Sequence, residues 1–304
     1  MLLLVVVTAI WGTTFPMVKT IGERSLEPAA IISVRFGFAA LVLSPWFRRL
    51  SWPKVRDGAT LGAVAFASYA TQTIGLEKVT SGRAAFITGL NVIMVPLALL
   101  LLGRRLHRLV IVAAGLAVFG IALMSWDDGA LRFAVGDIWI LACAVSYAAY
   151  VLLLERFAPR HHVVEFSAVQ VLTVALLGAG WLVVSRPMGS VRSLRDASSG
   201  TWLTLLYLGV VAVALSALLQ TRAQQIVPAP IAAIVYSLEP VFGAAASFAW
   251  RGERIAPIGF VGGALVITAM VLSQRVVLDR SPADAPPAGG AASFRPRIGR
   301  RARR

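Results

Sequence analysis

Long runs of apolar residues, separated by short polar segments, dominate this chain. Ten runs are about 20 residues long, the length that a helix needs to cross about 30 Å of hydrocarbon. They are too long and too uniformly apolar for the strands of a membrane barrel. The pattern therefore predicts an all-α integral membrane protein with ten transmembrane helices. We expect the spans at residues 2–19, 28–47, 57–76, 82–102, 109–126, 136–154, 162–184, 201–220, 230–250 and 255–273.

Residues 79–125 and 227–273 have similar residue types in the same order and with nearly the same spacing, so they form an internal repeat. An internal repeat made of membrane helices is typical of transporters whose halves move around a central site. Each half has an odd number of predicted crossings, so the second half enters the membrane upside down relative to the first. We therefore expect two inverted five-helix repeats, at residues 1–126 and 136–273.

The composition supports a membrane location. Hydrophobic residues make up 58% of the 304 residues, charged residues make up 14%, and the mean hydropathy is +0.78. A soluble domain cannot bury this much apolar surface in one core, so lipid must solvate much of it. The single cysteine, Cys143, excludes an intrachain disulfide.

The basic residues predict the orientation of the chain. From Asp279 onward the chain mixes Pro, Ala, Gly and Arg without periodicity, so we expect residues 274–304 to form a disordered basic tail. Anionic lipid of the cytoplasmic leaflet attracts such a tail, and we favour this role over nucleic-acid binding. The loops at 48–56 and 103–108 are also rich in Arg. The positive-inside rule thus predicts cytoplasmic termini in a multi-pass protein of the bacterial inner membrane type.

Four short motifs carry a family resemblance: Trp11-Gly12-Thr13-Thr14-Phe15, Val34-Arg35-Phe36, the segment from Thr80 to Asn91, and Ser237-Leu238-Glu239-Pro240-Val241-Phe242. Over about residues 1–275 the chain resembles the EamA branch of the drug/metabolite transporter superfamily. The resemblance implies a ten-helix inverted-repeat carrier, often an exporter of amino acids, metabolites or toxic compounds. It does not fix the substrate. The sequence departs from the usual pattern at Val92, where Pro is frequent, and at Arg104, where Glu is common.

Charged side chains inside apolar runs are the first candidates for a transport site, because a charge near the bilayer centre costs about 2.5–3.5 kcal/mol. Glu239 lies midway along the ninth run, next to Pro240, which removes a backbone donor and exposes carbonyl groups. We expect Glu239 to bind a cation, a proton or an amine, or else to pair with a neighbouring helix. Arg35 lies about two turns into the second run and has two corresponding roles: binding a substrate carboxylate, or pairing with a helix-end acid or carbonyl.

Other candidates follow from helical spacing. Asn91 is the repeat counterpart of Glu239 and shares a helical face with Thr88, as Tyr236 does with Glu239. This spacing predicts a substrate cavity at the membrane midplane, lined by the fourth and ninth runs. The other residues expected on its wall are Trp11, Phe15, Tyr69, Gln72, Tyr147 and Tyr150. The expected hinges or helix breaks are Pro16, Pro96 and Pro240.

These features predict a secondary transporter of small metabolites, amino acids or drug-like compounds that works by alternating access, and export is the expected direction. We expect a proton or substrate gradient to drive it, no cofactor or metal, and a monomer or homodimer in the lipid bilayer. A lipid or polyprenyl-carrier flippase on the same fold is the alternative. An integral membrane transferase is less favoured, because the only histidine cluster, His161-His162 with Glu165, does not place its two histidines on one helical face.

Overall fold

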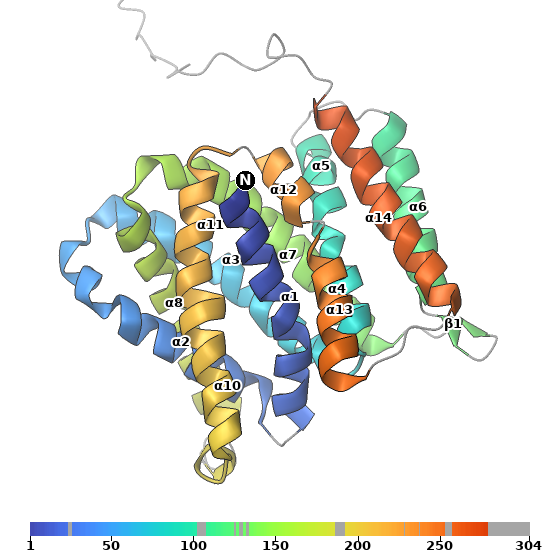
Figure 1. The fold of residues 1–304 in the computed structure, drawn as a ribbon. Helices are drawn as coiled ribbons and strands as arrows, with labels where there is room; N and C mark the ends of the chain where they lie inside the picture. The colour runs from blue at the N-terminus through green and yellow to red at the C-terminus, as the bar shows by residue number, and fades with distance from the viewer. Residues whose placement is uncertain are drawn as a thin grey trace, which may run out of the picture.

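The structure, a computed structural model, describes the chain except residues 24–25, 102–107, 125, 128–129, 132–133, 186–191, 228, 237, 253–256 and 279–304. Most described residues lie in helices (Figure 1). The α-helices are α1 (Leu2–Glu23), α2 (Pro28–Leu43), α3 (Trp52–Leu76), α4 (Ser81–Gly89), α5 (Asn91–Leu101), α6 (Arg108–Met124), α7 (Val135–Phe157), α8 (Val163–Ser185), α10 (Ser199–Gly209), α11 (Ser216–Gln224), α12 (Ala229–Tyr236), α13 (Glu239–Arg251) and α14 (Pro257–Leu278).

Shorter elements connect some of these helices. They are the 3-10 helices η1 (Ser44–Arg49) and η2 (Ala158–Arg160), the π-helix η3 (Val210–Leu215), and the antiparallel strands β1 (Trp126–Asp127) and β2 (Ala130–Leu131). Of the predicted tail, residues 274–278 belong to α14 instead, and residues 279–304 lie outside the described part.

Five helical segments of the described chain are long and apolar enough to cross a membrane: Leu2–Glu23, Pro28–Phe47, Val135–Arg160, Val163–Ser185 and Ser199–Gln224. The predicted spans at residues 82–102 and 230–250 are not single helices. Each is broken into two shorter ones, α4 with α5 and α12 with α13, and each of these four is too short to cross a bilayer alone.

The two broken pairs have the same arrangement of residues around the break. In the first pair Leu90 separates α4 from α5, which begins at Asn91. In the second pair α13 begins at Glu239, and Pro240 occupies its first turn. A proline at that position lacks only an N–H that would have no partner within the helix anyway. Asn91 and Glu239 therefore each begin the second helix of a broken pair.

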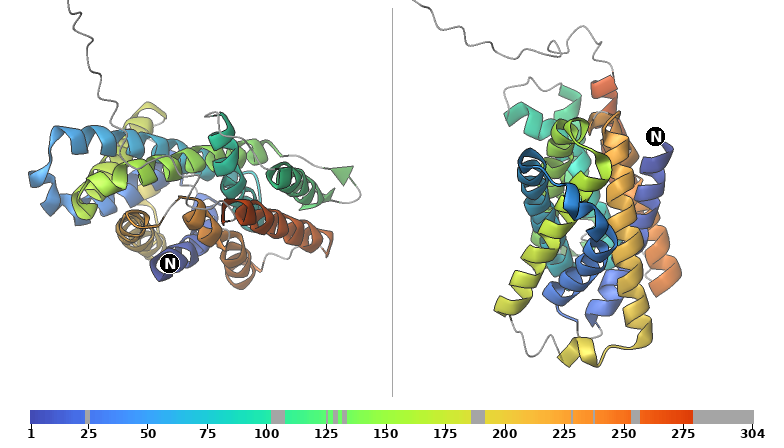
Figure 2. Two further views of the ribbon diagram at one scale, coloured as in Figure 1. Left: turned by 90° about the horizontal axis from the view of Figure 1, so that it is seen from above. Right: turned by 90° about the vertical axis from the view of Figure 1, so that its left-hand side faces the viewer.

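The helices form a bundle in which α1 lies at one face, between α11 and α13 (Figures 1 and 2). Helix α1 contacts α4, α11, α12 and α13, whereas α3 packs against α7 and α8, and α2 packs against α8 and α10. Helices α6 and α14 pack mainly along each other at one side of the bundle.

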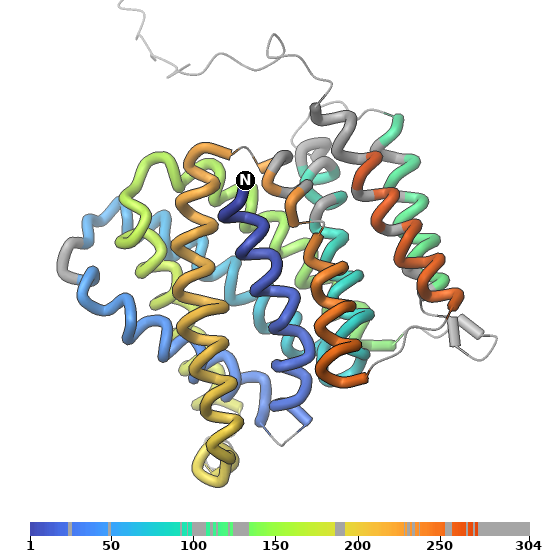
Figure 3. Tube along the Cα trace, viewed as in Figure 1, coloured from blue at the N-terminus to red at the C-terminus, as the bar shows by residue number. Residues whose placement is uncertain are grey.

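The two ends of the bundle can be followed in Figure 3. The chain starts at the upper end and runs down α1, and α14 later rises to the same end. We call this the N-terminal end. The opposite end carries the last turns of α1 and α13 (Figure 1).

Glycine allows α1, α13 and α4 to meet at close range. A Cβ atom added to Gly12 of α1 would lie 2.5 Å from the Cβ atom of Phe242, and one added to Gly243 of α13 would lie 2.6 Å from the Cβ atom of Ala85 in α4. Both distances are far below van der Waals contact, so larger residues would force the helices apart. Small residues at such crossings are typical of membrane proteins. Gly243 lies one helical turn from Glu239, so this crossing fixes the start of α13 against α1.

Candidate functional site

A cavity within the bundle brings together most of the charged and polar residues that the sequence singled out. Its empty space is about 480 Å³, open solvent included. We call it the charged cavity. It is lined by Trp11, Thr14, Arg35, Ser68, Tyr69, Gln72, Thr88, Cys143, Tyr147, Ala212, Val213 and Glu239. These residues come from α1, α2, α3 and α4 and also from α7, η3 and α13, so both halves of the chain contribute to its wall.

Glu239 provides the negative charge of this cavity. The break before α13 places it in the first turn of that helix, where the helix dipole favours a carboxylate. Only 4% of the residue is exposed. No hydrogen bond or ion pair joins its carboxylate to any other described residue. The structure therefore places at the cavity wall a buried carboxylate that has no partner among the described residues.

Arg35 provides the positive charge. It lies in α2 and is 3% exposed. The central carbon of its guanidinium group lies 4.6 Å from the ring centre of Tyr69 and 5.2 Å from that of Phe36, which is the geometry of a cation–π contact. Its Nε and Nη2 atoms have no hydrogen-bond partner in the described part of the chain. Aromatic rings hold this guanidinium group in place, and its donors remain available.

A second cavity adjoins the charged one and has a different character. It shares Trp11, Ser68, Tyr69, Tyr147 and Val213 with the charged cavity, so the two are continuous. We call it the aromatic cavity; its empty space is about 450 Å³, open solvent included. Its other lining residues are Phe36, Ala65, Tyr150, Gln170, Val171, Val174, Ala217 and Gln220.

Trp11 is held where the two cavities meet. Its indole Nε1 donates a hydrogen bond of 3.2 Å to the backbone oxygen of Ala212, in the π-helix η3. Its ring packs against Tyr147 and Tyr236, with centroid distances of 5.7 and 5.8 Å. A π-helix widens the turn and is frequent at functional sites. Here it presents the carbonyl oxygen of Ala212 to Trp11 of α1.

A hydrogen-bond network ties the tyrosines to glutamines at the wall of the aromatic cavity. The Tyr150 hydroxyl donates to Gln170 Oε1 at 3.0 Å. Gln220 Nε2 donates to the hydroxyl oxygens of Tyr147 at 2.9 Å and Tyr236 at 3.0 Å. The rings of Tyr147 and Tyr150 stack with a centroid distance of 5.7 Å. The network fixes the orientation of each of these three rings.

The structure places the sequence-predicted residues in three groups. One group lines the cavities: Trp11, Arg35, Tyr69, Gln72, Thr88, Tyr147, Tyr150 and Glu239. A second group is buried without lining either cavity: Phe15 packs in an apolar cluster, Tyr236 lies behind Trp11 in the tyrosine network, and Asn91 begins α5.

The third group comprises the predicted hinges. Helix α1 continues through Pro16 from Leu2 to Glu23, and Pro240 follows the break before α13. Pro96 lies within α5, and its side chain is outside the described part.

Sequence reasoning missed several wall residues, of which Gln170 and Gln220 are the most informative. The signal for them was present, because an amide side chain within an apolar run is costly to bury without a hydrogen bond. Thr14, Ser68 and Cys143 carry no comparable signal, since small polar side chains often bond to their own helix.

His161 and Glu165, from the histidine cluster that a transferase would need, instead form contacts with α3. His161 Nε2 lies 3.0 Å from Asp57 Oδ2, and Glu165 pairs with Lys54. The first contact joins α3 to the segment between η2 and α8, and the second joins α3 to the first turn of α8. Among the described residues, no three His, Cys, Asp or Glu side chains are grouped to hold a metal ion.

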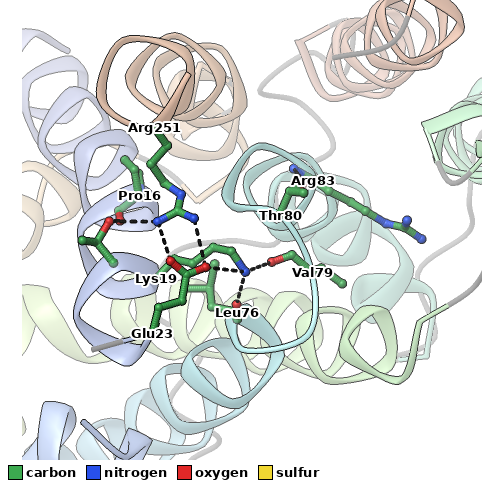
Figure 4. A network of polar contacts seen from close by, with 9 residues as sticks. Pro16, Lys19, Glu23, Leu76, Val79, Thr80, Arg83 and Arg251 are labelled. Carbon is green, nitrogen blue, oxygen red and sulfur yellow. Dashed lines mark hydrogen bonds and ion pairs between the residues drawn. The ribbon is translucent and has the colours of Figure 1, made fainter. Parts of the chain in front are cut away.

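A polar network at the end opposite the N-terminus joins α1 to α13 (Figure 4). The Arg251 guanidinium group, in the last turn of α13, donates two hydrogen bonds of 2.9 Å to the Glu23 carboxylate and one of 3.0 Å to Thr20 Oγ1. We call these three residues the α1–α13 tie.

Lys19 extends this network to the end of α3. Its Nζ atom donates to the backbone oxygens of Leu76 at 3.0 Å and Val79 at 2.6 Å, and lies 3.7 Å from the Glu23 carboxylate (Figure 4). Nearby, Arg83 in α4 pairs with Asp137 in α7 at 2.5 Å. Two charged contacts therefore join the first and second halves of the chain at this end.

Comparison with known families decides the class of the protein. The model of the EamA-like transporter family matches residues 1–126 and residues 134–274, which is most of the chain. The chain belongs to the EamA-like transporter family. As a member of this family it is a membrane protein and a small-molecule transporter rather than an enzyme.

Curated relatives of this EamA-family chain carry transporter names. An "Uncharacterized transporter" of Archaeoglobus fulgidus is 28% identical over 270 residues, which cover 88% of this chain and 83% of that protein. A "Probable terminal-alkyne amino-acid exporter" of Streptantibioticus cattleyicolor is 26% identical over 291 residues, with 92% and 94% covered. A "Probable amino-acid metabolite efflux pump" of Escherichia coli is 24% identical over 294 residues, with 89% and 93% covered.

A solved structure shares the fold of this EamA-family chain. The crystal structure of a protein superposes with a TM-score of 0.62 at 18% sequence identity, and the match covers 90% of this chain and 99% of the other. At that identity the likeness concerns the fold alone.

Proposed function

We propose that this EamA-family chain is a secondary transporter that exports small zwitterionic metabolites, such as amino acids, by alternating access. One observation carries the proposal. Glu239 and Arg35, two buried side chains of opposite charge, line one cavity, and neither has a hydrogen-bond or ion-pair partner in the described part of the chain.

The charges of the cavity favour a ligand that carries both an ammonium and a carboxylate group. A buried charge without a partner costs several kcal/mol, and a ligand charge of opposite sign offsets that cost. An ammonium group would bind Glu239, and a carboxylate would accept hydrogen bonds from the fork of Arg35 donors. A simple amine or a simple acid would leave one of the two unpaired. Two relatives with amino acids in their names support this substrate class.

The proposed architecture is ten crossings in two inverted five-helix repeats. In this arrangement α1 corresponds to α7, α2 to α8 and α6 to α14. Helix α3 corresponds to the continuous segment of α10, η3 and α11. Helices α4 and α5 correspond to α12 and α13. The two broken pairs support the correspondence, because Asn91 and Glu239 begin equivalent helices. The family match to residues 1–126 and again to 134–274 also supports it. The repeat domains would then be residues 1–126 and 136–273.

The contacts between helices fit an exchange of the two halves. Two contacts, α2 with α8 and α6 with α14, join corresponding elements. Further contacts occur in matched pairs: α4–α13 matches α5–α12, α3–α7 matches α1–α11, α3–α8 matches α2–α10, and α1–α13 matches α5–α7. A pseudo-twofold axis between the halves requires this pattern. Inverted repeats with a central site are the usual basis of alternating access.

In the proposed orientation the N-terminal end of the bundle faces the cytoplasm and the protein lies in the cell membrane. The α1–α13 tie and the Arg83–Asp137 pair then lie at the outer end. They would close that end in the state described here and separate when the cavity opens outward. The contacts of Lys54 with Glu165 and of Asp57 with His161 would act at the inner end. Glu239 would hold the coupling proton when the ammonium group is absent.

The test of this proposal compares three ligands with one side chain: L-leucine, the amine that lacks its carboxylate, and the acid that lacks its amino group. Ligand binding raises the melting temperature of a protein by mass action, with about 2.7 kcal/mol of added stability at 100 times the Kd. We expect the amino acid to raise the melting temperature of the purified protein more than the amine or the acid does.

L-leucine represents only one side chain. The same measurement is therefore repeated with the other common amino acids, in case the transporter prefers a different side chain. Exchange of the radiolabelled ligand across liposomes that hold the protein then tests transport. The proposal is wrong if no amino acid raises the melting temperature or exchanges, or if the amine or the acid binds as well as the amino acid does.

A further inference from the structure

Gln170, on the wall of the aromatic cavity, has unused hydrogen-bonding capacity. Gln170 of α8 is 3% exposed and lines this cavity. Its Oε1 atom accepts a hydrogen bond from the Tyr150 hydroxyl, and its Nε2 atom is buried without a hydrogen-bond partner among the described residues. Buried amide groups in native proteins are nearly always hydrogen-bonded, so an exception at a cavity wall needs an explanation.

The other glutamine on this wall has no such spare capacity. Gln220 Nε2 uses both of its hydrogens, toward the hydroxyls of Tyr147 and Tyr236, and its Oε1 atom lies 3.4 Å from the Tyr150 hydroxyl. The difference is robust to the orientation of the Gln170 amide. If that amide were rotated by 180°, its oxygen instead of its nitrogen would be left without a protein partner.

The position of Gln170 is fixed by its surroundings. Tyr150 holds one end of the amide. The backbone of α3 approaches that of α8 at the same level, because a Cβ atom added to Gly62 would lie 2.7 Å from the backbone oxygen of Gln170. The unused atom therefore belongs to a side chain whose backbone and amide are both restrained, which suits recognition of a ligand.

The walls of the aromatic cavity select for a flat group. Trp11, Tyr69 and Tyr147 line both cavities, and Phe36 and Tyr150 add two more rings to the aromatic one. Tyr69 also carries the Arg35 guanidinium group on its face. A ligand whose charged group lies between Arg35 and Glu239 would thus extend its side chain past these rings toward Gln170.

We propose that Gln170 determines substrate specificity by hydrogen bonding to a hydroxyl or carbonyl group at the far end of a flat substrate side chain. A hydroxyl group suits both orientations of the amide, because it donates and accepts. This inference rests on the proposed function, in which the charged cavity binds the zwitterionic group. It adds that the aromatic cavity binds the side chain and that Gln170 reads its polar end.

The experiment measures the affinity of the purified full-length protein for three ligands: L-tyrosine, L-phenylalanine and 4-methyl-L-phenylalanine. The methyl group resembles the hydroxyl in size and cannot form the hydrogen bond. We expect tyrosine to bind about tenfold more tightly than either other ligand. This is the gain in affinity expected from one hydrogen bond to a buried group that otherwise has no partner. This comparison uses the unaltered chain, so it does not depend on the folding of a variant.

The variant Gln170→Met then removes the amide at nearly constant volume. We expect it to bind the three ligands with equal affinity. The control is Gln225→Met, because Gln225 lines neither cavity and donates to the backbone oxygens of Ala158 and His161. We expect this control to keep the tenfold preference.

Equal binding of the three ligands by the unaltered chain, or an unchanged preference in Gln170→Met, would overturn this inference and leave the proposed function in place. If none of the three binds while L-leucine does, the inference is also wrong. If no amino acid binds at all, the proposed function itself fails, and the inference fails with it.

Discussion

At the scale of single residues, the unpaired charges of Glu239 and Arg35 are the most consequential feature of the molecule. Each is almost completely buried, and neither forms an ion pair or a side-chain hydrogen bond with any described residue. Side chains that only hold helices together show the opposite pattern, as Asp137 does in its ion pair with Arg83. A charge that is buried at a cavity wall and left unpaired is better explained by a ligand than by stability.

Because Glu239 has no partner among the described residues, the effect of Glu239→Gln can be predicted. Removing an unpaired buried charge relieves a desolvation cost, so we expect the melting temperature to stay the same or rise. Loss of the charged contact to the ligand should weaken substrate binding by about 2–5 kcal/mol, or at least about 30-fold, and transport should fall accordingly. Melting curves and ligand titrations of the purified variant measure both effects.

The matched control is Asp137→Asn, which breaks an ion pair instead. We expect it to lower the melting temperature. Its effect on the affinity for substrate should be much smaller than the loss of about 30-fold in Glu239→Gln, because Asp137 does not line the charged cavity. A Glu239→Gln variant that melts earlier and binds normally would show that Glu239 has a packing role.

The sequence predicted these two charges because a charge within an apolar run stands out at once. It separated the aromatic side chains less well: four of the six predicted for the cavity wall line a cavity, whereas Phe15 and Tyr236 do not. Trp11 and Phe15 lie one turn apart on the same helix, yet Trp11 lines both cavities, whereas Phe15 packs in an apolar cluster. Neighbouring helices decide that outcome, and periodicity carries no information about them.

At the scale of helices, breaks and a wide turn build the cavity. Pro240 indicated the break before α13. At the other break Gly89 ends α4, but a single glycine within an apolar run is a weak signal for the end of a helix. The π-helix η3 consists of six ordinary apolar residues, Val210–Leu215. Its stabilising contact comes from another part of the chain, the Trp11 indole that donates to Ala212. Local sequence therefore predicts the spans better than the interruptions within them.

The α1–α13 tie supplies a prediction at this scale. The Glu23 side chain is 51% exposed, so its pair with Arg251 is worth about 1 kcal/mol or less, which shifts a two-state equilibrium by at most about fivefold. We expect Glu23→Gln to favour the outward-open state by up to that factor. In liposomes, labelling of Cys143 from the outer face by a charged thiol reagent should speed up correspondingly.

Asp196→Asn is the control, because Asp196 pairs with Arg192 four residues earlier and joins no two helices of the bundle. It should leave the labelling rate unchanged. A double variant, Glu23→Arg with Arg251→Glu, should restore the original rate. Unchanged labelling in Glu23→Gln would contradict a role for the tie in closing the outer end.

At the scale of the whole molecule, the proposed exchange of two inverted halves explains why a single cavity contains residues from both. Seven of its wall residues precede residue 126 and five follow residue 136: Trp11, Thr14, Arg35, Ser68, Tyr69, Gln72 and Thr88 against Cys143, Tyr147, Ala212, Val213 and Glu239. A motion of one half against the other would open this cavity to one face of the membrane and close it to the other. The repeated motifs in the sequence predicted that arrangement, whereas the contacts between the halves depend on packing that only the structure describes.

The native cysteine allows the most direct test of this account. Cys143 is the single cysteine of the chain, and it lines the charged cavity. Protein in liposomes would be exposed to a small charged thiol reagent on one face at a time, with Cys143→Ser as the unlabelled control. The account predicts labelling of Cys143 from each face and protection from both when a bound amino acid is present. Labelling from only one face under all conditions, or from neither, would contradict alternating access through this cavity.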